Sequence, residues 1–397
     1  MKITLSRRVA QIKPSPTLSL SAAANRLKAS GRPIINLTVG EPDFDTPEFI
    51  KQAAHQALDQ GCTKYTAVDG IASLKQAIID KFKQENKLSY EANQIIVSSG
   101  AKQCIYNLMQ ALLNPGDEVI IPAPYWVSYP DMALMAEAKP VFISTTIEQH
   151  LKITATQLAQ AITPKTRLLI INSPSNPSGM VYTREELTEL AAVLLKNPQV
   201  FILTDDIYEH IYWGEQAFEN IVNVCPELYE RTIVLNGCSK AYAMTGWRIG
   251  YAAGAKEIIQ AMTNIQSQST SNPNSIAQVA AKAALTGNQD CVREMNKVYQ
   301  QRHQFFSEGL NDIPGVNCLA AMGAFYCFPS FSHFIGEGKA FNSDYELADY
   351  LLNKADIATV PGSAFGAPGH LRLSFATDEI NLKNALVKLK EALNAFK

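Results

Sequence analysis

Several signatures that identify common protein classes are absent from these 397 residues. No apolar run approaches the ~20 residues that a membrane-spanning helix requires. The seven cysteines are scattered and odd in number, and none forms a CxxC pair, which excludes a zinc ribbon and a thioredoxin-type motif. The six histidines are dispersed without an HExxH pattern. The sequence therefore predicts neither a membrane protein nor a metal site.

An excess of one charge is also missing. The chain has 35 Lys and Arg against 37 Asp and Glu, so it lacks the basic footprint of a nucleic-acid binder. Its first sixteen residues, MKITLSRRVAQIKPSP, contain no apolar segment of signal-peptide length. We therefore expect a cytoplasmic protein with neither a nucleic-acid nor a membrane partner.

What the chain does have is a succession of short apolar runs separated by segments of helical periodicity. The predicted strands cover residues 94–97, 118–121, 167–171, 200–203, 232–235 and 248–252. Apolar residues recur at helical spacing over residues 105–112, and Asn114-Pro115-Gly116 then ends that helix. Several strands are continuously apolar, as in strands buried on both faces. This pattern predicts an α/β fold with a mainly parallel sheet.

The C-terminal part has a different pattern. A long helical stretch over residues 290–310 precedes Pro314-Gly315, and an amphipathic helix is predicted over 379–396. Between them, residues 370–375 alternate, so that Leu371 and Leu373 share one face and Arg372 takes the other. We therefore predict a large domain over residues 47–290, and a smaller α+β domain that combines 1–46 with 291–397.

Polar residues at the carboxyl ends of the predicted strands carry most of the functional information. In open α/β sheets, ligands bind beyond these strand ends. A glycine-rich turn, an indole, an amide, a carboxylate, a phenol and a lysine would therefore meet in one crevice. These groups belong to Gly100, Trp126, Asn176, Asp205, Tyr208 and Lys240.

Each of these residues taken alone has an ordinary structural explanation. Asp205 suits a helix N-cap, Trp126 a core position, and Lys240 with Arg248 an exposed surface. Together they meet the demands of pyridoxal phosphate, which needs a lysine amine, a carboxylate for its ring nitrogen, and a cation with backbone donors for its phosphate. An amino-acid substrate further needs an arginine for its carboxylate, and Arg372 is available.

The motifs in which these residues lie are NLTVGEPDFDTP, KYTAVDG, SSGAKQ, PYWVSY, NSPSNPSG, TDDIYEH, SKAYAMTGWRIGY and HLRLSFA. Throughout its length the chain resembles the class I aminotransferases of fold type I, which have a large domain with a seven-stranded sheet. It is most similar to the bacterial aspartate aminotransferase subgroup, some members of which also aminate prephenate. The spacing of eight residues between Lys240 and Arg248 is typical of this superfamily.

The resemblance implies pyridoxal 5′-phosphate as cofactor. Lys240 would form the Schiff base and act as the catalytic base, and Asp205 would pair with the ring nitrogen. Tyr208 and Asn176 would bond the phenolic oxygen, and Trp126 would stack on the ring. The phosphate would be held by residues from two motifs, namely Gly100, Ala101, Lys102, Ser239 and Arg248.

The resemblance also implies the substrate contacts. Arg372 would bind the α-carboxylate, together with Asn176, Trp126 and the backbone of Gly40. Lys102 would bind a distal carboxylate, and Lys13 matches a position associated with prephenate, although either could be a solvated lysine. Tyr65 would reach the phosphate bound in the neighbouring subunit, which implies a homodimer with shared active sites.

The expected activity is amino-group transfer between L-aspartate and 2-oxoglutarate by a ping-pong mechanism, with prephenate as a further acceptor. The alternatives are another class I aminotransferase, for aromatic, alanine or kynurenine-type substrates, or a related β-lyase. A cofactor-sensing regulator would need an added DNA-binding domain, for which the pattern leaves no room. A nucleotide-binding module lacks support, because neither GxGxxG with its acidic partner nor GxxxxGK[ST] is present.

Overall fold

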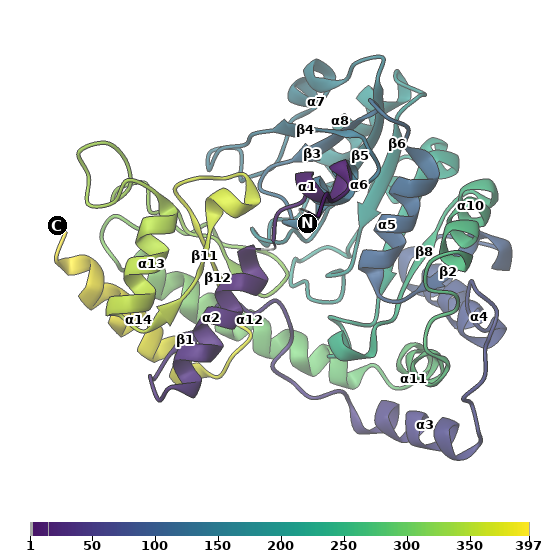
Figure 1. The fold of residues 1–397 in the computed structure, drawn as a ribbon, viewed down its shortest axis with the longest axis horizontal. Coiled ribbons are helices and arrows are strands. Elements are labelled where there is room, and N and C mark those ends of the chain that lie inside the picture. Colours follow the sequence, from purple (N-terminus) through teal and green to yellow (C-terminus); the bar gives the residue numbers. More distant parts are fainter. Residues whose placement is uncertain (1–2, 15, 397) are drawn as a thin grey trace.

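A seven-stranded sheet is the centre of this computed structural model, which describes residues 3–14 and 16–396 (Figure 1). The strand order is β2-β8-β7-β6-β5-β3-β4. β8 is antiparallel to both of its neighbours, and the other pairs are parallel, which confirms the predicted mainly parallel sheet. The strands are β2 (Ile95–Ser98), β3 (Glu118–Pro122), β4 (Lys139–Ile143), β5 (Thr166–Asn172), β6 (Phe201–Asp205), β7 (Thr232–Gly237) and β8 (Gly250–Ala253).

Helices cover both faces of this sheet. As a result, successive residues of β5 enter different hydrophobic clusters: Leu169 and Ile171 face one, Leu168 and Ile170 the other. This two-sided burial explains why the strand is continuously apolar. The helices of this part are α3 (Glu48–Asp59), α4 (Ala72–Lys81), α5 (Ala101–Leu112), α6 (Ser128–Met135), α7 (Ala155–Ala161), α8 (Arg184–Leu195), α9 (Ile221–Val224), α10 (Lys256–Ser267) and α11 (Ser275–Thr286).

Two strand assignments differ from the prediction. β4 was not predicted, because several of its residues are exposed or only half-buried and its apolar signal is weak. The strand predicted from residue 248 begins two residues later, at Gly250. Arg248 instead caps the short helical turn Thr245–Trp247 with a left-handed φ of 57°. Arg248 therefore lies before β8 and is not part of the sheet.

The smaller part of the structure joins the two ends of the chain. Parallel β1 (Ile35–Asn36) pairs with β10 (Ile357–Ala358), and β11 (Val360–Pro361), β12 (Leu371–Ser374) and β9 (Tyr326–Cys327) form an antiparallel sheet. In Figure 1 the purple α2 lies on the yellow-green C-terminal part, against β10 and β11. The helices here are α1 (Arg7–Gln11), α2 (Pro16–Ala29), α12 (Asp290–Asn311), α13 (Asp344–Lys354) and α14 (Glu379–Asn394).

One hydrophobic cluster occupies the smaller part of the structure and also includes Ile207, Tyr208 and Ile211, which follow β6. It unites Ile35 and Leu37 with buried residues of α12, α13 and α14. The boundaries after residues 46 and 290 stay a prediction, and residues 1–2, 15 and 397 of the predicted small domain lie outside the described residues. α12 spans the division, because Val292 packs in the large part while Met295 and Leu310 pack in the small one. Among the described residues, no helix has the length and apolar character needed to cross a membrane.

Candidate active site

A cleft of about 440 Å³ lies beyond the carboxyl ends of β5, β6 and β7, between the two parts of the molecule. It gathers residues from the N-terminal segment, the strand ends and β12. The predicted site residues that line it are Gly40, Ala101, Lys102, Trp126, Asn176, Asp205, Tyr208, Ser239, Lys240, Arg248 and Arg372. Most of the predicted set is therefore close together in space, although its members are up to 332 residues apart.

Positively charged side chains outnumber carboxylates in the lining of the cleft. Its cations belong to Lys102, Lys240, Arg248 and Arg372, whereas its carboxylates belong to Glu41 and Asp205. Low-dielectric walls strengthen the field of such a group of charges. The cleft is therefore suited to an anionic ligand.

Lys240 follows β7 and is half-buried in the cleft wall. Its Nζ donates a hydrogen bond to the carbonyl of Gly40 and lies 5.8 Å from the ring centroids of Tyr208 and Phe325. Burial, with the nearby Arg372 guanidinium, lowers the pKa of Lys240 to about 8. A substantial fraction of this amine is therefore neutral near pH 7–8, as a nucleophile or a general base requires.

Asp205 is the last residue of β6 and is buried at the floor of the cleft. Its Oδ2 accepts a hydrogen bond of 2.6 Å from the Tyr129 hydroxyl, and its Oδ1 accepts one of 3.3 Å from the Ile207 amide. Burial raises the pKa of Asp205 to about 6, against the opposing effect of the Tyr129 hydrogen bond. The carboxylate is thus available to a cationic group in the cleft.

Arg372, on β12, is only 2% exposed. Its Nη1 donates to Asn176 Oδ1 at 3.0 Å, and its Nη2 donates to the Thr38 carbonyl at 2.6 Å. Among the described residues, its Nε has no hydrogen-bond partner. A buried guanidinium with a free donor suits a carboxylate ligand, since an unmade bond there is costly. The polar face of β12 is thus the cleft face, not a solvent face.

Tyr208 and Tyr326 join the two parts of the molecule within the cleft. Their hydroxyl oxygens lie 2.9 Å apart, with Tyr208 following β6 and Tyr326 on β9. The Arg372 guanidinium carbon lies 4.5 Å from the centroid of the Tyr326 ring. Tyr326 therefore fixes the phenol and the arginine relative to each other.

A close approach between α5 and β8 forms a cradle at one end of the cleft. Gly100 precedes α5 with a φ of 89°, and a Cβ at this position would lie 2.2 Å from Arg248 Nη2. A Cβ at Gly250 would lie 2.1 Å from the Ala101 nitrogen. The two glycines thus let the Arg248 guanidinium approach the N-terminus of α5, where backbone N–H groups and the helix dipole favour an anion. Ser239 lines the same cleft.

Lys102 and Trp126 are neighbours on one wall. The Lys102 Nζ lies 4.8 Å from the Trp126 ring centroid, and the lysine side chain is exposed to the cleft. Burial and the charge of Arg248 lower the pKa of Lys102. This lysine is therefore a second cation of the cleft, in addition to the buried guanidinium of Arg372.

Three predicted residues lie outside the lining of the cleft within this chain: Gly100, which belongs to the cradle, Lys13 and Tyr65. Lys13 is exposed and interacts with Asp131 of α6, where its charge and a backbone hydrogen bond oppose the effect of burial on the pKa of that carboxyl. Tyr65 is 92% exposed. An exposed tyrosine of this kind is available to a second copy of the chain.

Sequence reasoning did not select Tyr129 or Tyr326, although both line the cleft. Tyr326 lies in the run AFYCF, which is indistinguishable from a core strand. Tyr129 had a weak signal, because it follows Trp126 by three residues at the start of a helix and so shares its face.

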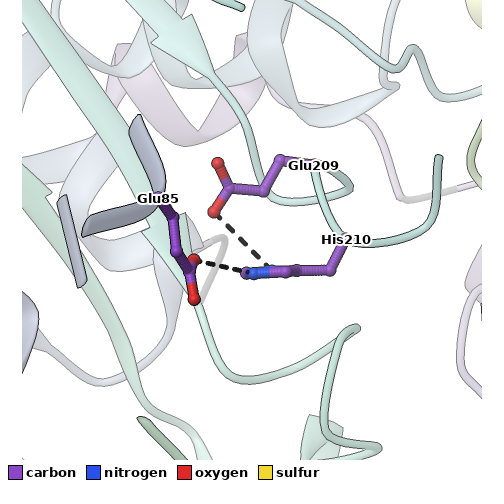
Figure 2. A group of neighbouring side chains, drawn as sticks. All are labelled: Glu85, Glu209 and His210. Carbon is purple, nitrogen blue, oxygen red and sulfur yellow. Dashed lines mark hydrogen bonds and ion pairs between the residues drawn. The ribbon is translucent and has the colours of Figure 1, made fainter. Parts of the chain in front are cut away.

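A charged cluster lies outside the cleft lining, at Glu85, Glu209 and His210 (Figure 2). Their nearest ligand atoms lie within 4.8 Å of one another, and His210 Nε2 is 2.9 Å from Glu85 Oε2. However, the Lys81 ammonium bonds Glu209 Oε1 and lies 3.5 Å from Glu85 Oε2. An ammonium therefore neutralises the carboxylates that a metal ion would need, and we assign the cluster a structural role.

Comparisons with known proteins agree with this geometry. Residues 32–389 match the family model described as aminotransferase class I and II. A curated relative from Nitrosomonas europaea, named aspartate/prephenate aminotransferase, is 58% identical over 395 residues, which make up 98% of this chain and 100% of the relative.

Solved structures with the same fold are also known. The aspartate aminotransferase of Rhizobium meliloti is 46% identical, with a TM-score of 0.96 and coverage of 100% of both chains. The aspartate aminotransferase of Thermus thermophilus with maleate is 42% identical, with a TM-score of 0.93 and coverage of 99% of this chain and 100% of the other. The fold described above is thus shared over its full length.

Proposed function

This chain belongs to the class I and II aminotransferases, and from that membership we propose that it is a pyridoxal-phosphate-dependent aspartate aminotransferase. It transfers the amino group reversibly between L-aspartate and 2-oxoglutarate, and it also accepts prephenate. The observation that carries the proposal is the meeting of Lys240, Asp205 and Arg372 in one cleft. The amine and the carboxylate suit the cofactor, and the guanidinium suits the carboxylate of an amino acid.

The residues present fit pyridoxal phosphate. In the cradle, Gly100 and Gly250 let the Arg248 guanidinium and the N-terminus of α5 lie close together, and this combination of a cation with backbone N–H groups matches a phosphate. Ser239 and the backbone of Ala101 and Lys102 would complete that phosphate site. Asp205 would pair with the ring nitrogen, while Trp126, Tyr208 and Asn176 would contact the ring and its phenolic oxygen.

When bound, pyridoxal phosphate supplies an aldehyde carbon that amines join, and a ring that withdraws electrons from the carbon beside the amine. Lys240 would hold the cofactor, and the same amine, when free, would remove the Cα proton of the substrate as a general base. Its lowered pKa, about 8, keeps it able to accept that proton at neutral pH.

Arg372 binds the substrate α-carboxylate. Its two Nη atoms are held by Asn176 and Thr38, so the planar guanidinium is already oriented before a ligand arrives. Lys102 binds the distal carboxylate of aspartate or 2-oxoglutarate, because it is the cleft cation that remains, exposed beside Trp126. For prephenate, we assign Lys13 of the N-terminal segment, which interacts with Asp131 of α6 in this structure.

The functional unit is a homodimer in the cytoplasm. Tyr65 of one subunit contacts the phosphate in the other, which accounts for a large exposed tyrosine that lines no part of its own cleft. The cysteines are free in this structure, which supports a reducing compartment.

A screen of single half-reactions tests the substrate assignment. The enzyme loaded with pyridoxal phosphate is mixed with one amino acid at a time, and conversion of the cofactor to its amine form is followed by absorbance. We expect aspartate, glutamate and arogenate to convert the cofactor about fivefold faster than alanine or kynurenine, since a second ionic contact to an exposed cation contributes on the order of 1 kcal/mol. Faster conversion by alanine, kynurenine or phenylalanine would favour another class I aminotransferase, and elimination products would favour a β-lyase.

A further inference from the structure

The buried Asp205 carboxylate accepts hydrogen bonds from two donors, a backbone amide and a side-chain hydroxyl. The Ile207 amide belongs to the same strand end and reaches Oδ1 at 3.3 Å. The Tyr129 hydroxyl comes from α6 and reaches Oδ2 at the shorter distance of 2.6 Å. The phenol is only 2% exposed, so water does not replace it. Tyr129 is therefore the principal partner from outside the strand that carries this carboxylate.

Tyr129 has a second contact with the site, through the Trp126 ring. Tyr129 lies in the first turn of α6, and its ring packs edge-on against Trp126 with centroids 5.3 Å apart and an interplanar angle of 84°. The indole that lines the cleft and the hydroxyl beneath it are thus fixed by the same helix start. A shift of α6 would move both the indole and the donor to Asp205.

We propose that Tyr129 is a positioning residue of this site, whose hydroxyl turns the Asp205 carboxylate toward the ring nitrogen of the cofactor and keeps that carboxylate ionised. The proposal rests on the proposed function, because it assumes that Asp205 faces pyridoxal phosphate. By donating to Oδ2, Tyr129 leaves lone pairs of Oδ1 for the ring nitrogen. A short hydrogen bond to the charged form also favours ionisation in a buried place.

The electrostatics of the surroundings show why such a donor is needed. Burial raises the pKa of Asp205 to about 6, and the Tyr129 hydrogen bond is the largest influence that lowers it, ahead of the Ile207 amide and the charge of Lys240. A protonated Asp205 could not balance a protonated ring nitrogen. The hydroxyl of Tyr129 thus supports the charge on which the cofactor contact depends.

A double-mutant cycle tests this role, with cofactor affinity as its readout. The Tyr129→Phe variant removes one hydroxyl and keeps the ring that packs on Trp126. Apoenzymes of the native chain, Tyr129→Phe, Asp205→Ala and the double variant are titrated with pyridoxal phosphate, and the dissociation constant is read from absorbance. We expect Tyr129→Phe to raise this constant about tenfold in the native background, and less than about twofold in the Asp205→Ala background, because its effect passes through Asp205.

The matched control is Tyr229→Phe. The Tyr229 hydroxyl also donates a 2.6 Å hydrogen bond, to the Ser89 carbonyl, but it lies outside the cleft lining. Its loss should leave cofactor affinity within about twofold of the native value. An equal loss of affinity in both Asp205 backgrounds, or no loss in either, would overturn the positioning role while leaving the proposed function intact. Failure of the native apoenzyme to bind pyridoxal phosphate would overturn both.

Discussion

At the scale of single residues, the cleft depends on side chains whose charge is costly to bury. Arg372 offsets this cost with bonds to Asn176 and Thr38, and with the faces of Tyr326 and Phe365 at 4.5 and 5.1 Å. Lys240 has a single hydrogen-bond acceptor among the described residues, the Gly40 carbonyl. This difference explains why the arginine is suited to bind a ligand and the lysine to react with one.

The lowered pKa of Lys240 predicts a pH dependence for loading of the apoenzyme. Only the neutral amine attacks an aldehyde, so the rate constant with pyridoxal phosphate should rise about tenfold per pH unit below about pH 8 and become level above it. Stopped-flow absorbance measures this rate, with Lys240→Ala as the control for other lysines. A rate that still rises tenfold per unit between pH 9 and 10 would contradict the lowered pKa.

Substitution of Arg372 by lysine should separate charge from geometry. A lysine retains the positive charge but cannot make two parallel bonds to a carboxylate. We expect kcat/KM for aspartate to fall about 10²-fold, since disrupting a buried hydrogen-bonded charge pair costs roughly 2–5 kcal/mol. Steady-state kinetics would check this, and an unchanged kcat/KM would remove Arg372 from the substrate site.

Lys102 should affect only substrates with two carboxylates. In Lys102→Ala we expect KM for 2-oxoglutarate and aspartate to rise about fivefold, since an exposed cation contributes on the order of 1 kcal/mol. Phenylalanine, which lacks the distal carboxylate, is the matched control substrate and should be unaffected. An equal effect on phenylalanine and aspartate would instead indicate a role for Lys102 at the phosphate.

At the scale of elements, the strand ends organise the site. The sheet order places the ends of β5, β6 and β7 side by side, so that Asn176, Asp205 and Lys240 meet although no short motif contains them. The continuous apolar runs were enough to predict these strands. Their polar ends line one cleft, and the roles that the resemblance gives them stay predictions. The turn at Arg248 was not predictable, because the left-handed φ of 57° is a feature of tertiary contact with α5.

The aromatic residues of the site were harder to find from sequence. Tyr326 and Tyr129 are buried among apolar neighbours, so each resembles an ordinary residue of the hydrophobic core. Only the three-dimensional position of each hydroxyl, beside Tyr208 or Asp205, distinguishes it from packing. The spacing of apolar residues predicts which face of a helix or strand is buried. It does not predict which buried atom faces a ligand.

The start of α5 gives a prediction at this scale. In Gly100→Ala the added Cβ would displace the Arg248 guanidinium, so affinity for pyridoxal phosphate should fall about tenfold or more with the loss of one charge-assisted contact. Gly116→Ala is a matched control, since its φ of 87° is similar but no atom lies within 4 Å of the added Cβ. Both variants should lose about 1 kcal/mol of stability from backbone strain. Equal cofactor affinity in the two would contradict the cradle.

At the scale of the whole molecule, the proposed dimer makes a prediction through Tyr65. If this tyrosine acts in the neighbouring subunit, a heterodimer of a Tyr65→Ala chain and a Lys240→Ala chain contains one complete site. That site combines Lys240 of the Tyr65→Ala chain with Tyr65 of the Lys240→Ala chain. It should bind pyridoxal phosphate with native affinity. The Tyr65→Ala homodimer should bind about tenfold more weakly, since a bond to a charged group contributes roughly 1.5–3 kcal/mol.

Differently tagged chains, purified as heterodimers and titrated with pyridoxal phosphate, would check this arrangement. The Lys240→Ala homodimer is the control that forms no covalent link. Weak binding in the heterodimer, equal to that of the Tyr65→Ala homodimer, would mean that each tyrosine acts within its own subunit. A particle mass of 43.6 kDa, that of one chain, would argue against a dimer altogether.

The pairing of β1 with β10 has a consequence for folding during synthesis on the ribosome. Ile35 is joined in register to Ile357, so the ribosome must add more than three hundred residues before the first strand has its partner. At roughly 5–20 residues per second, this interval lasts on the order of tens of seconds. During that time Ile34, Ile35 and Leu37, all buried in the finished fold, emerge without a place to pack. The nascent chain therefore offers chaperones an apolar N-terminal segment long before its large sheet is complete.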